Sequence, residues 1–235
     1  MTWAVVTGVT SGIGRALTER LLADGWQVAG IGRDRAALAA LEGQRFRPVC
    51  VDLASPAARA VAFATLAEEL PAVHALVNNA AEIVYEAPLA EPPEKLNALF
   101  EVNLMAAVEL VQALAPRLAA GGTVVNLSSV VARHLPAARY APYAASKAAL
   151  EQISHGMRLE LMPRGVRVAL IAPGLVDTPA YAKVPSFAKA EAALRAAVPR
   201  WLSADDVAEA VAWILARPAH VNVADLVLVP TGQGR

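Results

Sequence analysis

The sequence of 235 residues predicts a doubly wound α/β fold, in which about seven parallel strands form a sheet with helices on both faces. β-rich apolar runs alternate with amphipathic runs along almost the whole chain. The strand candidates are near-continuous hydrophobic runs, as is typical of parallel strands buried on both faces. The first of them leads directly into a glycine-rich turn. Because no low-complexity linker interrupts this pattern, we expect one domain over residues 1–235.

Each element is predicted from hydrophobic periodicity and its flanking residues. The expected strands cover residues 3–7, 27–31, 47–51, 75–78, 122–127, 166–171 and 226–229. The expected helices cover residues 13–23, 35–41, 56–69, 95–118, 143–161 and 205–216. Ser203 and Asp206 resemble a capping box at the start of the last helix. The proline-containing segment 177–200 is expected to be a long irregular lid over a binding site.

Composition narrows the class of protein. A formal net charge of +0 gives no reason to expect nucleic acid or an anionic membrane as a partner. The single cysteine, Cys50, excludes an internal disulfide, suits a reducing compartment and is expected to be a small buried hydrophobe. No apolar run is expected to reach membrane-spanning length, and the chain opens on a strand without a signal peptide, so we expect a cytoplasmic protein. The four histidines show no metal-ligand spacing, and no metal is expected.

The turn after the first strand indicates a phosphate site. It contains Gly8, Thr10, Ser11, Gly12, Ile13 and Gly14. Glycines at such a turn let the backbone approach a diphosphate, and the start of the following helix offers free N–H groups with a positive dipole end. A glycine triplet alone is a weak signal, but its position between the first strand and the first helix makes it specific.

Tyr143 and Lys147 are four residues apart in a predicted helix, so their side chains share one face. A lysine ammonium beside a phenol favours the phenolate, and we therefore expect Lys147 to lower the pKa of Tyr143. A tyrosine tuned in this way is able to exchange a proton with a substrate oxygen. Tyr140 lacks a lysine at that spacing and is expected at most to line the pocket.

The motifs together resemble the short-chain dehydrogenase/reductase family, in its compact single-domain branch with a Rossmann fold. The turn has the spacing T-G-x-x-x-G-x-G, and further marks of the family follow in order over nearly the whole chain. They are Asp52, Asn78-Asn79-Ala80-Ala81, Asn103, Ser128-Ser129, Tyr143, Lys147, Pro173-Gly174 and Thr178. Two features depart from the family pattern: Ala81 replaces a glycine, and the loop from Ser129 to Tyr143 is longer by about one residue. Either Ser128 or Ser129 is left as the candidate active-site serine, and we favour Ser129.

This resemblance implies roles for individual residues. Tyr143 is the expected general acid or base, Lys147 tunes it and binds the nicotinamide ribose, and Ser129 donates to the carbonyl oxygen. The backbone of Asn103 is expected to hold a water that connects the lysine to solvent. The expected cofactor-binding residues are Gly8, Thr10, Ser11, Gly12, Ile13, Gly14, Arg15, Arg33, Asp52, Leu53, Asn79, Ala80, Ala81, Tyr143, Lys147, Pro173, Gly174, Val176 and Thr178.

The end of the second strand favours NADP(H) over NAD(H). The position where a carboxylate would accept the adenosine ribose hydroxyls is Gly32, and Arg33 follows it. An arginine suits a 2′-phosphate, and we expect Arg15 to be able to reach the same phosphate. Asp34 is the competing acid for NAD(H), but we favour its role as the N-cap of the next helix.

The sequence therefore predicts an NADP(H)-dependent oxidoreductase that acts on a ketone, an aldehyde or a secondary alcohol. The alternatives are an NAD(H)-preferring alcohol dehydrogenase of the same family, a non-catalytic dinucleotide-binding regulator, or another Rossmann enzyme such as a methyltransferase. Tyr181, Val184 and Phe187 in the lid favour an apolar or aromatic carbonyl. Because family members often pair the helix 95–118 and the next helix across subunits, a homodimer or homotetramer is expected.

Overall fold

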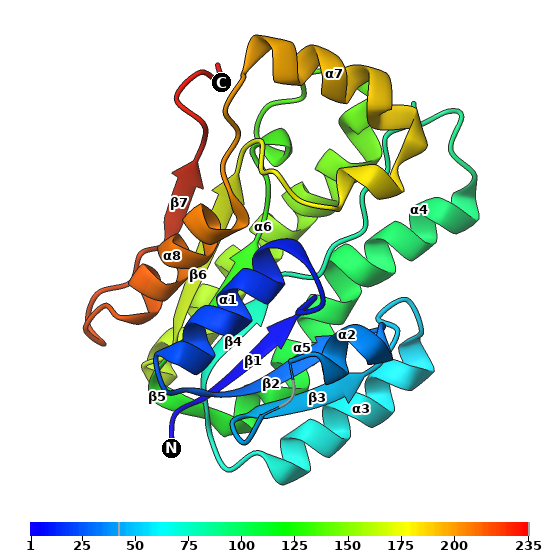
Figure 1. Cartoon of the computed structure of the whole chain (residues 1–235). Helices are drawn as coiled ribbons and strands as arrows, with labels where there is room; N and C mark the ends of the chain where they lie inside the picture. The colour runs from blue at the N-terminus through cyan, green and yellow to red at the C-terminus, as the bar shows by residue number, and fades with distance from the viewer. Residues whose placement is uncertain (42, 235) are drawn as a thin grey trace.

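A computed structural model of the chain describes residues 1–41 and 43–234 and contains a seven-stranded sheet in the order β3-β2-β1-β4-β5-β6-β7. All six neighbouring pairs are parallel, which confirms the predicted fold class (Figure 1). The strands are β1 Trp3–Thr7, β2 Gln27–Gly32, β3 Phe46–Cys50, β4 Val73–Asn78, β5 Leu118–Leu127, β6 Arg167–Pro173 and β7 Asp225–Leu228. The strand order reverses between β1 and β4, which is where ligands bind in open α/β sheets.

Helices cover both faces of the sheet (Figure 1). They are α1 Gly12–Ala23, α2 Arg35–Ala39, α3 Pro56–Glu69, α4 Pro93–Phe100, α5 Ala106–Leu114, α6 Ala141–Leu161, α7 Ala188–Ala197 and α8 Ala204–Leu215. Leu17 of α1, Leu38 of α2 and Val211 of α8 belong to one buried apolar cluster. Phe63 of α3 and Leu110 of α5 belong to a second cluster, together with side chains of α6. The sheet thus separates two cores, as its near-continuous apolar strands require.

The predicted helix 95–118 differs in detail. It begins at Pro93, and a π-helical segment, Glu101–Met105, separates α4 from α5. Leu118 already belongs to β5 and pairs with Val73. Helix 93–117 is long and apolar enough to cross a membrane by length and composition, so the expectation that no run reaches this length was wrong. In this fold the helix packs against α3 and α6.

Two further expectations were wrong. The segment 177–200 is not irregular, because it contains two 3-10 turns, Tyr181–Lys183 and Pro185–Phe187, followed by α7. Alanine is the best helix former, and it accounts for six of the ten residues of α7. Cys50 is exposed rather than buried, since it is the last residue of edge strand β3. Its thiol donates to the Arg33 carbonyl at 3.8 Å.

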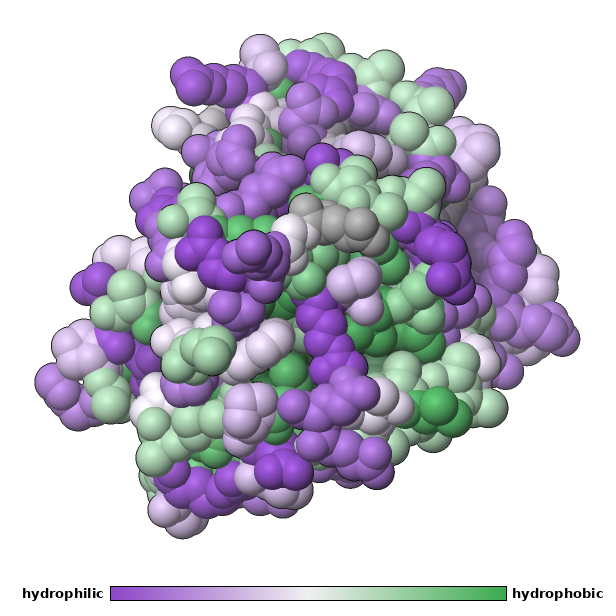
Figure 2. Space-filling view, turned by 60° about the horizontal axis from the view of Figure 1, so that its bottom comes forward, coloured by the Kyte–Doolittle hydropathy of each residue, from purple (hydrophilic) through white to green (hydrophobic). Residues whose placement is uncertain are grey.

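The predicted helix starts are observed. Asp34 accepts from the Ala37 N–H at 3.0 Å and caps α2, which was the favoured interpretation of this residue. Ser203 and Asp206 form a reciprocal capping box at the start of α8. Figure 2, which brings the bottom of the Figure 1 view forward, shows hydrophilic side chains distributed among hydrophobic ones over the surface in that view.

Candidate active site

A cavity of about 1040 Å³ lies along the edge of the sheet where the strands have their carboxyl ends. Residues at or just beyond the end of each of the seven strands line it. In chain order they are Gly8, Gly32, Asp52, Asn79, Ser128, Gly174 and Val229. Because all strands are parallel, seven loops that are remote in sequence converge on one site.

The glycine turn between β1 and α1 has no room for side chains. A Cβ atom on Gly8 would lie 2.8 Å from the Asn79 side-chain nitrogen, and one on Gly14 would overlap the Gly8 carbonyl. Gly8 has φ +74° and Gly12 has φ +54°, in the region that favours glycine. Thr7 fixes the turn to β4, because its hydroxyl accepts from the N–H groups of Asn79 and Ala80 at 3.0 and 2.9 Å.

The start of α1 presents its free backbone N–H groups to the cavity. Ser11 is the N-cap, yet its side chain makes no capping hydrogen bond. Thr10, Ser11, Gly12 and Ile13 line the cavity. An anion held by these N–H groups would take the place of the missing side-chain cap. The arrangement fits a diphosphate.

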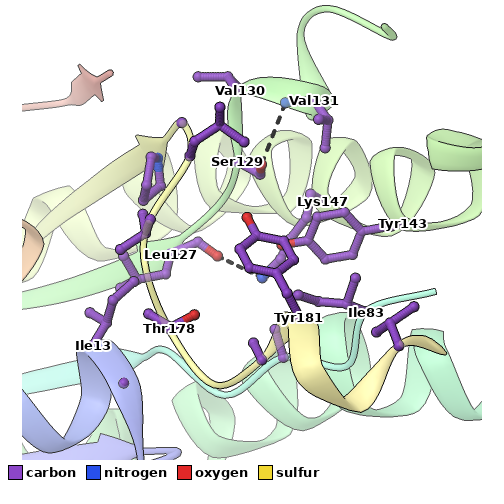
Figure 3. A pocket seen from close by; sticks show the side chains of 18 of the residues that line it. Ile13, Ile83, Leu127, Ser129, Val130, Val131, Tyr143, Lys147, Thr178 and Tyr181 are labelled. Carbon is purple, nitrogen blue, oxygen red and sulfur yellow. Dashed lines mark hydrogen bonds between the residues drawn. The ribbon is translucent and has the colours of Figure 1, made fainter. Parts of the chain in front are cut away.

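Tyr143 and Lys147 lie at the same cavity as Ser129 (Figure 3). The Lys147 ammonium is 5.9 Å from the centroid of the Tyr143 ring and donates to the Leu127 carbonyl at 2.8 Å. Figure 3 shows both side chains reaching from α6 toward the end of β5, where Ser129 follows. The Ser129 hydroxyl lies near enough to Tyr143 to act on the pKa of its phenol. The structure thus brings three of the four predicted catalytic residues to one point.

Burial controls the pKa values of this pair. Desolvation raises the pKa of Tyr143 above its ordinary value, and hydrogen bonding to Ser129 only partly opposes it. The sequence-based expectation that Lys147 lowers the pKa of Tyr143 was therefore wrong for this structure. Desolvation also lowers the pKa of Lys147 to about 8, because its side chain is 2% exposed. Lys147 is thus still mostly protonated at pH 7, but it loses its proton at a lower pH than an exposed lysine does.

Polar side chains inside the core orient α6. Asn78 of β4 donates to Asn126 of β5 at 2.8 Å, and Asn126 donates to Ser154 of α6 at 2.7 Å. All three side chains are buried. Together with the Lys147 contact to Leu127, they fix α6 against two successive residues of β5. Sequence analysis did not assign a role to Asn126 or Ser154, because a lone buried amide or hydroxyl carries no motif.

Asn103, the fourth predicted catalytic residue, lies in the π-helical segment and is 1% exposed. Its Oδ1 accepts from the Glu82 N–H at 2.7 Å, and its Nδ2 donates to the Glu82 carbonyl and to the Ser146 hydroxyl. Ser146 in turn donates to the Tyr143 carbonyl at 2.7 Å. The Asn103 side chain therefore connects the loop after β4 to α6 and does not line the cavity. Only its backbone is available for the predicted water.

The two candidate serines point in different directions. The Ser128 hydroxyl donates to Glu151 of α6 at 2.7 Å, and this carboxylate is also paired with Arg133. Ser129 points toward Tyr143 instead, and its hydroxyl accepts from the Val131 N–H at 3.5 Å (Figure 3). This geometry favours Ser129, as the sequence did.

The cavity end near β2 and β3 carries the candidate adenosine residues. Arg33 is exposed and lines the cavity, as do Asp52 and Leu53. Arg15 was expected here but does not line the cavity, because it points along α1 and pairs with Glu19 at 2.8 Å. Gly14 is buried beneath the turn and has a packing role. Ala81 lines the cavity without left-handed backbone, so its methyl group adds no strain in place of glycine.

The loop after β6 closes the other side. Pro173, Gly174, Val176 and Thr178 all line the cavity. Gln233, near the end of the chain, packs on Gly174 and accepts from the Leu175 N–H at 2.9 Å. Sequence analysis missed Gln233, as well as Ile83 and Tyr85 after β4, since none of them belongs to a motif. Tyr140 and Phe187 line the cavity as expected. Trp201 does not line it and packs with Leu175 and Val198.

The fold and this site together define an α/β protein built to hold a dinucleotide beside a buried tyrosine–lysine pair. Two observations fit such a cofactor. The glycine turn leaves no room for added side chains, and the N-terminus of α1 has backbone N–H groups without a side-chain cap. Among the described residues, no cluster of histidine, cysteine, aspartate or glutamate is arranged to hold a metal ion.

Comparisons with known proteins identify the family. Residues 2–189 match the family described as short chain dehydrogenase, and the chain belongs to this family. Serine 3-dehydrogenase from Rhizobium radiobacter is 34% identical over 97% of this chain and 94% of the relative. This relative and others are dehydrogenases or reductases, and the chain is accordingly an oxidoreductase of the short-chain dehydrogenase family.

Solved structures agree with this assignment. The closed form of a serine dehydrogenase complexed with NADP+ superposes with a TM-score of 0.86 at 28% identity, covering 100% of this chain and 97% of that one. A short-chain dehydrogenase from Burkholderia cenocepacia in complex with NADP has a TM-score of 0.86 at 32% identity, covering 97% of this chain and 96% of that one.

Proposed function

We propose that the protein is an NADP(H)-dependent oxidoreductase that interconverts a ketone or aldehyde with the corresponding alcohol, with Tyr143 as the general acid or base. The observation that carries the proposal is that Tyr143, Lys147 and Ser129 line the same cavity as the glycine turn, with the Lys147 ammonium 5.9 Å from the centroid of the Tyr143 ring. When bound, the cofactor supplies or accepts the hydride.

Each side chain has a defined part in this proposal. Tyr143 transfers its hydroxyl proton to the carbonyl oxygen during reduction and takes it back during oxidation. Ser129 donates a hydrogen bond to the same oxygen, where negative charge develops. Lys147, held by the Leu127 carbonyl, supplies positive charge next to the tyrosine whenever it is protonated. Asn103 holds the turn of α6 that carries Tyr143, through Ser146.

NADP(H) is proposed ahead of NAD(H) because of charge. Arg33 follows β2 and lines the cavity, and Gly32 provides no carboxylate at the position that would repel a 2′-phosphate. Asp34, the competing acid, is engaged as the cap of α2. Two structural neighbours are complexes with NADP, which supports the same choice. We propose Gly8, the 10–13 turn, Asp52, Leu53, the 79–81 segment and the 173–178 loop as the other cofactor contacts.

Removing one oxygen atom tests this function. The Tyr143→Phe variant is expected to bind NADPH with an affinity within about twofold of wild type and to lose at least about a hundredfold in carbonyl reduction, since general acid catalysis typically contributes 10²–10⁴-fold. NADPH fluorescence measures binding, and absorbance at 340 nm measures turnover.

Tyr140→Phe, a cavity tyrosine without a lysine partner, is the matched control and is expected to keep its turnover. Undiminished reduction by Tyr143→Phe contradicts the proposal, and NADPH binding without turnover by wild type favours a non-catalytic regulator.

We also propose that the enzyme acts in the cytoplasm as a homodimer or homotetramer. The lone cysteine, whose thiol is exposed, suits a reducing compartment. Exposed apolar side chains on the long helices, Met105 before α5 and Ile153 and Leu159 on α6, support pairing with a second copy.

A further inference from the structure

The part of the cavity between Tyr143 and the lid has walls that select a substrate class. We propose that this part of the site binds an uncharged ketone or aldehyde carrying a phenyl ring or a group of similar size and apolarity, and that Tyr181 is the residue that recognises the ring. The inference rests on the proposed function and names its substrate. This substrate class differs from serine, the amino acid that appears in the name of the relative serine 3-dehydrogenase.

Apolar side chains from three separate segments surround the Tyr143 hydroxyl. Ile83 comes from the loop after β4, Val130 and Val131 follow β5, and Tyr181 comes from the lid (Figure 3). The lid helix α7 adds small and branched apolar side chains to the same lining: Ala190, Ala193, Leu194 and Ala197. A substrate whose carbonyl oxygen reaches Tyr143 and Ser129 therefore places its remaining atoms against these apolar side chains.

A cluster of aromatic rings forms another part of the cavity lining. The Tyr85 ring is 4.8 Å from the Tyr140 ring and 5.1 Å from the Phe187 ring, each in an edge-to-face arrangement. Tyr181 stacks on Phe187 at 4.9 Å with an interplanar angle of 23°. All four rings line the cavity. A substrate that carries an aromatic ring is able to pack against this cluster in the same edge-to-face or offset arrangement.

Tyr181 is the member of this cluster closest to the chemistry. Figure 3 shows its ring beside that of Tyr143, and the neighbouring phenol contributes to the raised pKa of Tyr143. Burial raises the pKa of Tyr181 to about 12, and hydrogen bonding from the Val176 backbone only partly offsets this. Tyr181 therefore stays neutral at working pH and offers an aromatic face beside the reacting oxygen.

The arginines near this end of the cavity already have carboxylate partners. Arg133 pairs with Glu151 and Asp225, and Arg139 pairs with Glu86 at 2.9 Å. Arg195 pairs with Asp177 and Glu191 and lies 4.1 Å over the Trp201 ring. A substrate carboxylate would therefore enter without an available guanidinium, and burying it unpaired costs free energy.

Besides Lys147 next to Tyr143, two other basic side chains line the cavity away from the adenosine end. Lys183 and His134 are both exposed and lie on opposite segments, the lid turn and the loop after β5. Since both are exposed to solvent, charge attraction to them is weakened by water. If the substrate carries a carboxylate instead, Lys183 and His134 are the residues expected to bind it.

The reaction balances without another reactant. A ketone, NADPH and a proton give a secondary alcohol and NADP+, with the hydride added to the carbonyl carbon and the Tyr143 proton to the oxygen. A matched pair tests the wall chemistry: 1-phenyl-2-propanone and phenylpyruvate share the benzyl ketone, and a carboxylate replaces the methyl group only in the second. Acetone removes the ring, and L-serine with NADP+ tests the amino acid.

We expect kcat/KM for 1-phenyl-2-propanone to exceed the values for phenylpyruvate and for acetone by at least about tenfold, and serine oxidation to be slower still. Calorimetry of the dead-end complex with NADP+, in which no hydride is transferred, is expected to give the same order of affinities. Tyr181→Ala and Tyr181→Leu are expected to lower kcat/KM for 1-phenyl-2-propanone by about tenfold, mainly through KM. Trp213→Ala, at an exposed ring on α8, is the control and is expected to leave it unchanged.

The outcomes separate the two proposals. A preference for phenylpyruvate or serine that is abolished by Lys183→Ala or His134→Ala overturns the substrate class and leaves the oxidoreductase function intact. Retained turnover of the phenyl ketone in both Tyr181 variants overturns the role of Tyr181. Reduction of none of these carbonyls, together with NADPH binding, overturns both the substrate class and the proposed catalytic function.

Discussion

At the scale of single residues, burial decides the behaviour of the catalytic pair more than neighbouring charge does. Tyr143 and Lys147 are one helical turn apart, as their spacing requires, yet desolvation dominates both pKa values. The pKa of the phenol rises, whereas that of the ammonium falls to about 8. Both shifts favour the neutral forms of the side chains, because both groups are removed from water where α6 packs against the end of a buried strand.

The lowered pKa of Lys147 predicts a pH-dependent stability. Below pH 8 the folded state must hold a buried ammonium, whereas above pH 10.5 the lysine is neutral in both the folded and unfolded states. Between these values the unfolded state binds more protons, so the free energy of unfolding rises with pH, by about 3 kcal/mol in total. Urea denaturation of wild type and Lys147→Met from pH 7 to 10.5 measures the difference.

The difference between wild type and Lys147→Met is expected to grow in favour of wild type across this window. Lys95→Met serves as the control because Lys95 is 71% exposed, and it is expected to show no such trend. A pH-independent difference for Lys147→Met contradicts the assignment of a lowered pKa.

Arg33 carries the prediction about the cofactor. Arg33→Ala is expected to weaken NADPH binding by about 10- to 100-fold, since a hydrogen bond between charged groups is worth about 1.5–3 kcal/mol. NADH, without the 2′-phosphate, is expected to bind with an affinity within about twofold of wild type. Fluorescence titration with both cofactors measures these constants. Arg15→Ala is the matched control, because Arg15 pairs with Glu19 outside the cavity. An equal loss for both cofactors in Arg33→Ala would exclude a phosphate contact.

At the scale of elements, the long helix 93–117 contributes both to the candidate active site and to a buried ion-pair cluster. Its π-helical segment carries Asn103 and Glu101, and α5 carries Glu109. The two glutamates are the partners of Arg59 from α3, whose side chain is 0% exposed. Arg59 donates to Glu101 at 2.6 Å, to Glu109 at 2.8 Å and to the Leu53 carbonyl. Short π segments frequently occur at functional sites. Here the π segment is connected through Arg59 to Leu53, which lines the adenosine end of the cavity.

Breaking this buried ion-pair cluster is expected to destabilise the fold. Arg59→Met leaves two carboxylates facing each other without a cation, and we expect the free energy of unfolding to fall by about 3 kcal/mol. The triple variant Arg59→Met, Glu101→Gln, Glu109→Gln is expected to recover part of this loss. Arg20→Met, at an exposed cluster with Asp24 and Glu209, is expected to change stability little. Urea denaturation checks all three, and equal effects of Arg59→Met and Arg20→Met would contradict the role of burial.

At the scale of the whole molecule, the order of the strands assembles the site. β1 lies between β2 and β4, so Gly8 meets Asn79 although 71 residues separate them. β5 and β6 follow on the same side, which places Ser129 and Gly174 on the cavity opposite Arg33. The lid then crosses above, with Ser186 donating to the Tyr85 carbonyl at 2.8 Å. Its aromatic residues thereby complete a wall that no single segment contains.

Sequence alone determined the features that depend on local periodicity and backbone geometry. The parallel fold, the glycine turn, the shared face of Tyr143 and Lys147 and the caps at Asp34 and Ser203 follow from residues within a few positions of one another. A resemblance carried by ordered motifs added the family. These features were recognisable because helix and strand repeats, and the steric needs of a tight turn, are written in neighbouring residues.

Only the tertiary structure decided the features that depend on distant neighbours. The direction of the Tyr143 pKa shift, the pairing of Arg15 away from the cavity and the exposure of Cys50 each reflect what lies across the fold. The aromatic wall around Tyr181 joins residues that are about 100 positions apart, such as Tyr85 and Phe187. Burial and electrostatics are properties of the packed chain, and a pattern of neighbouring residues does not contain them.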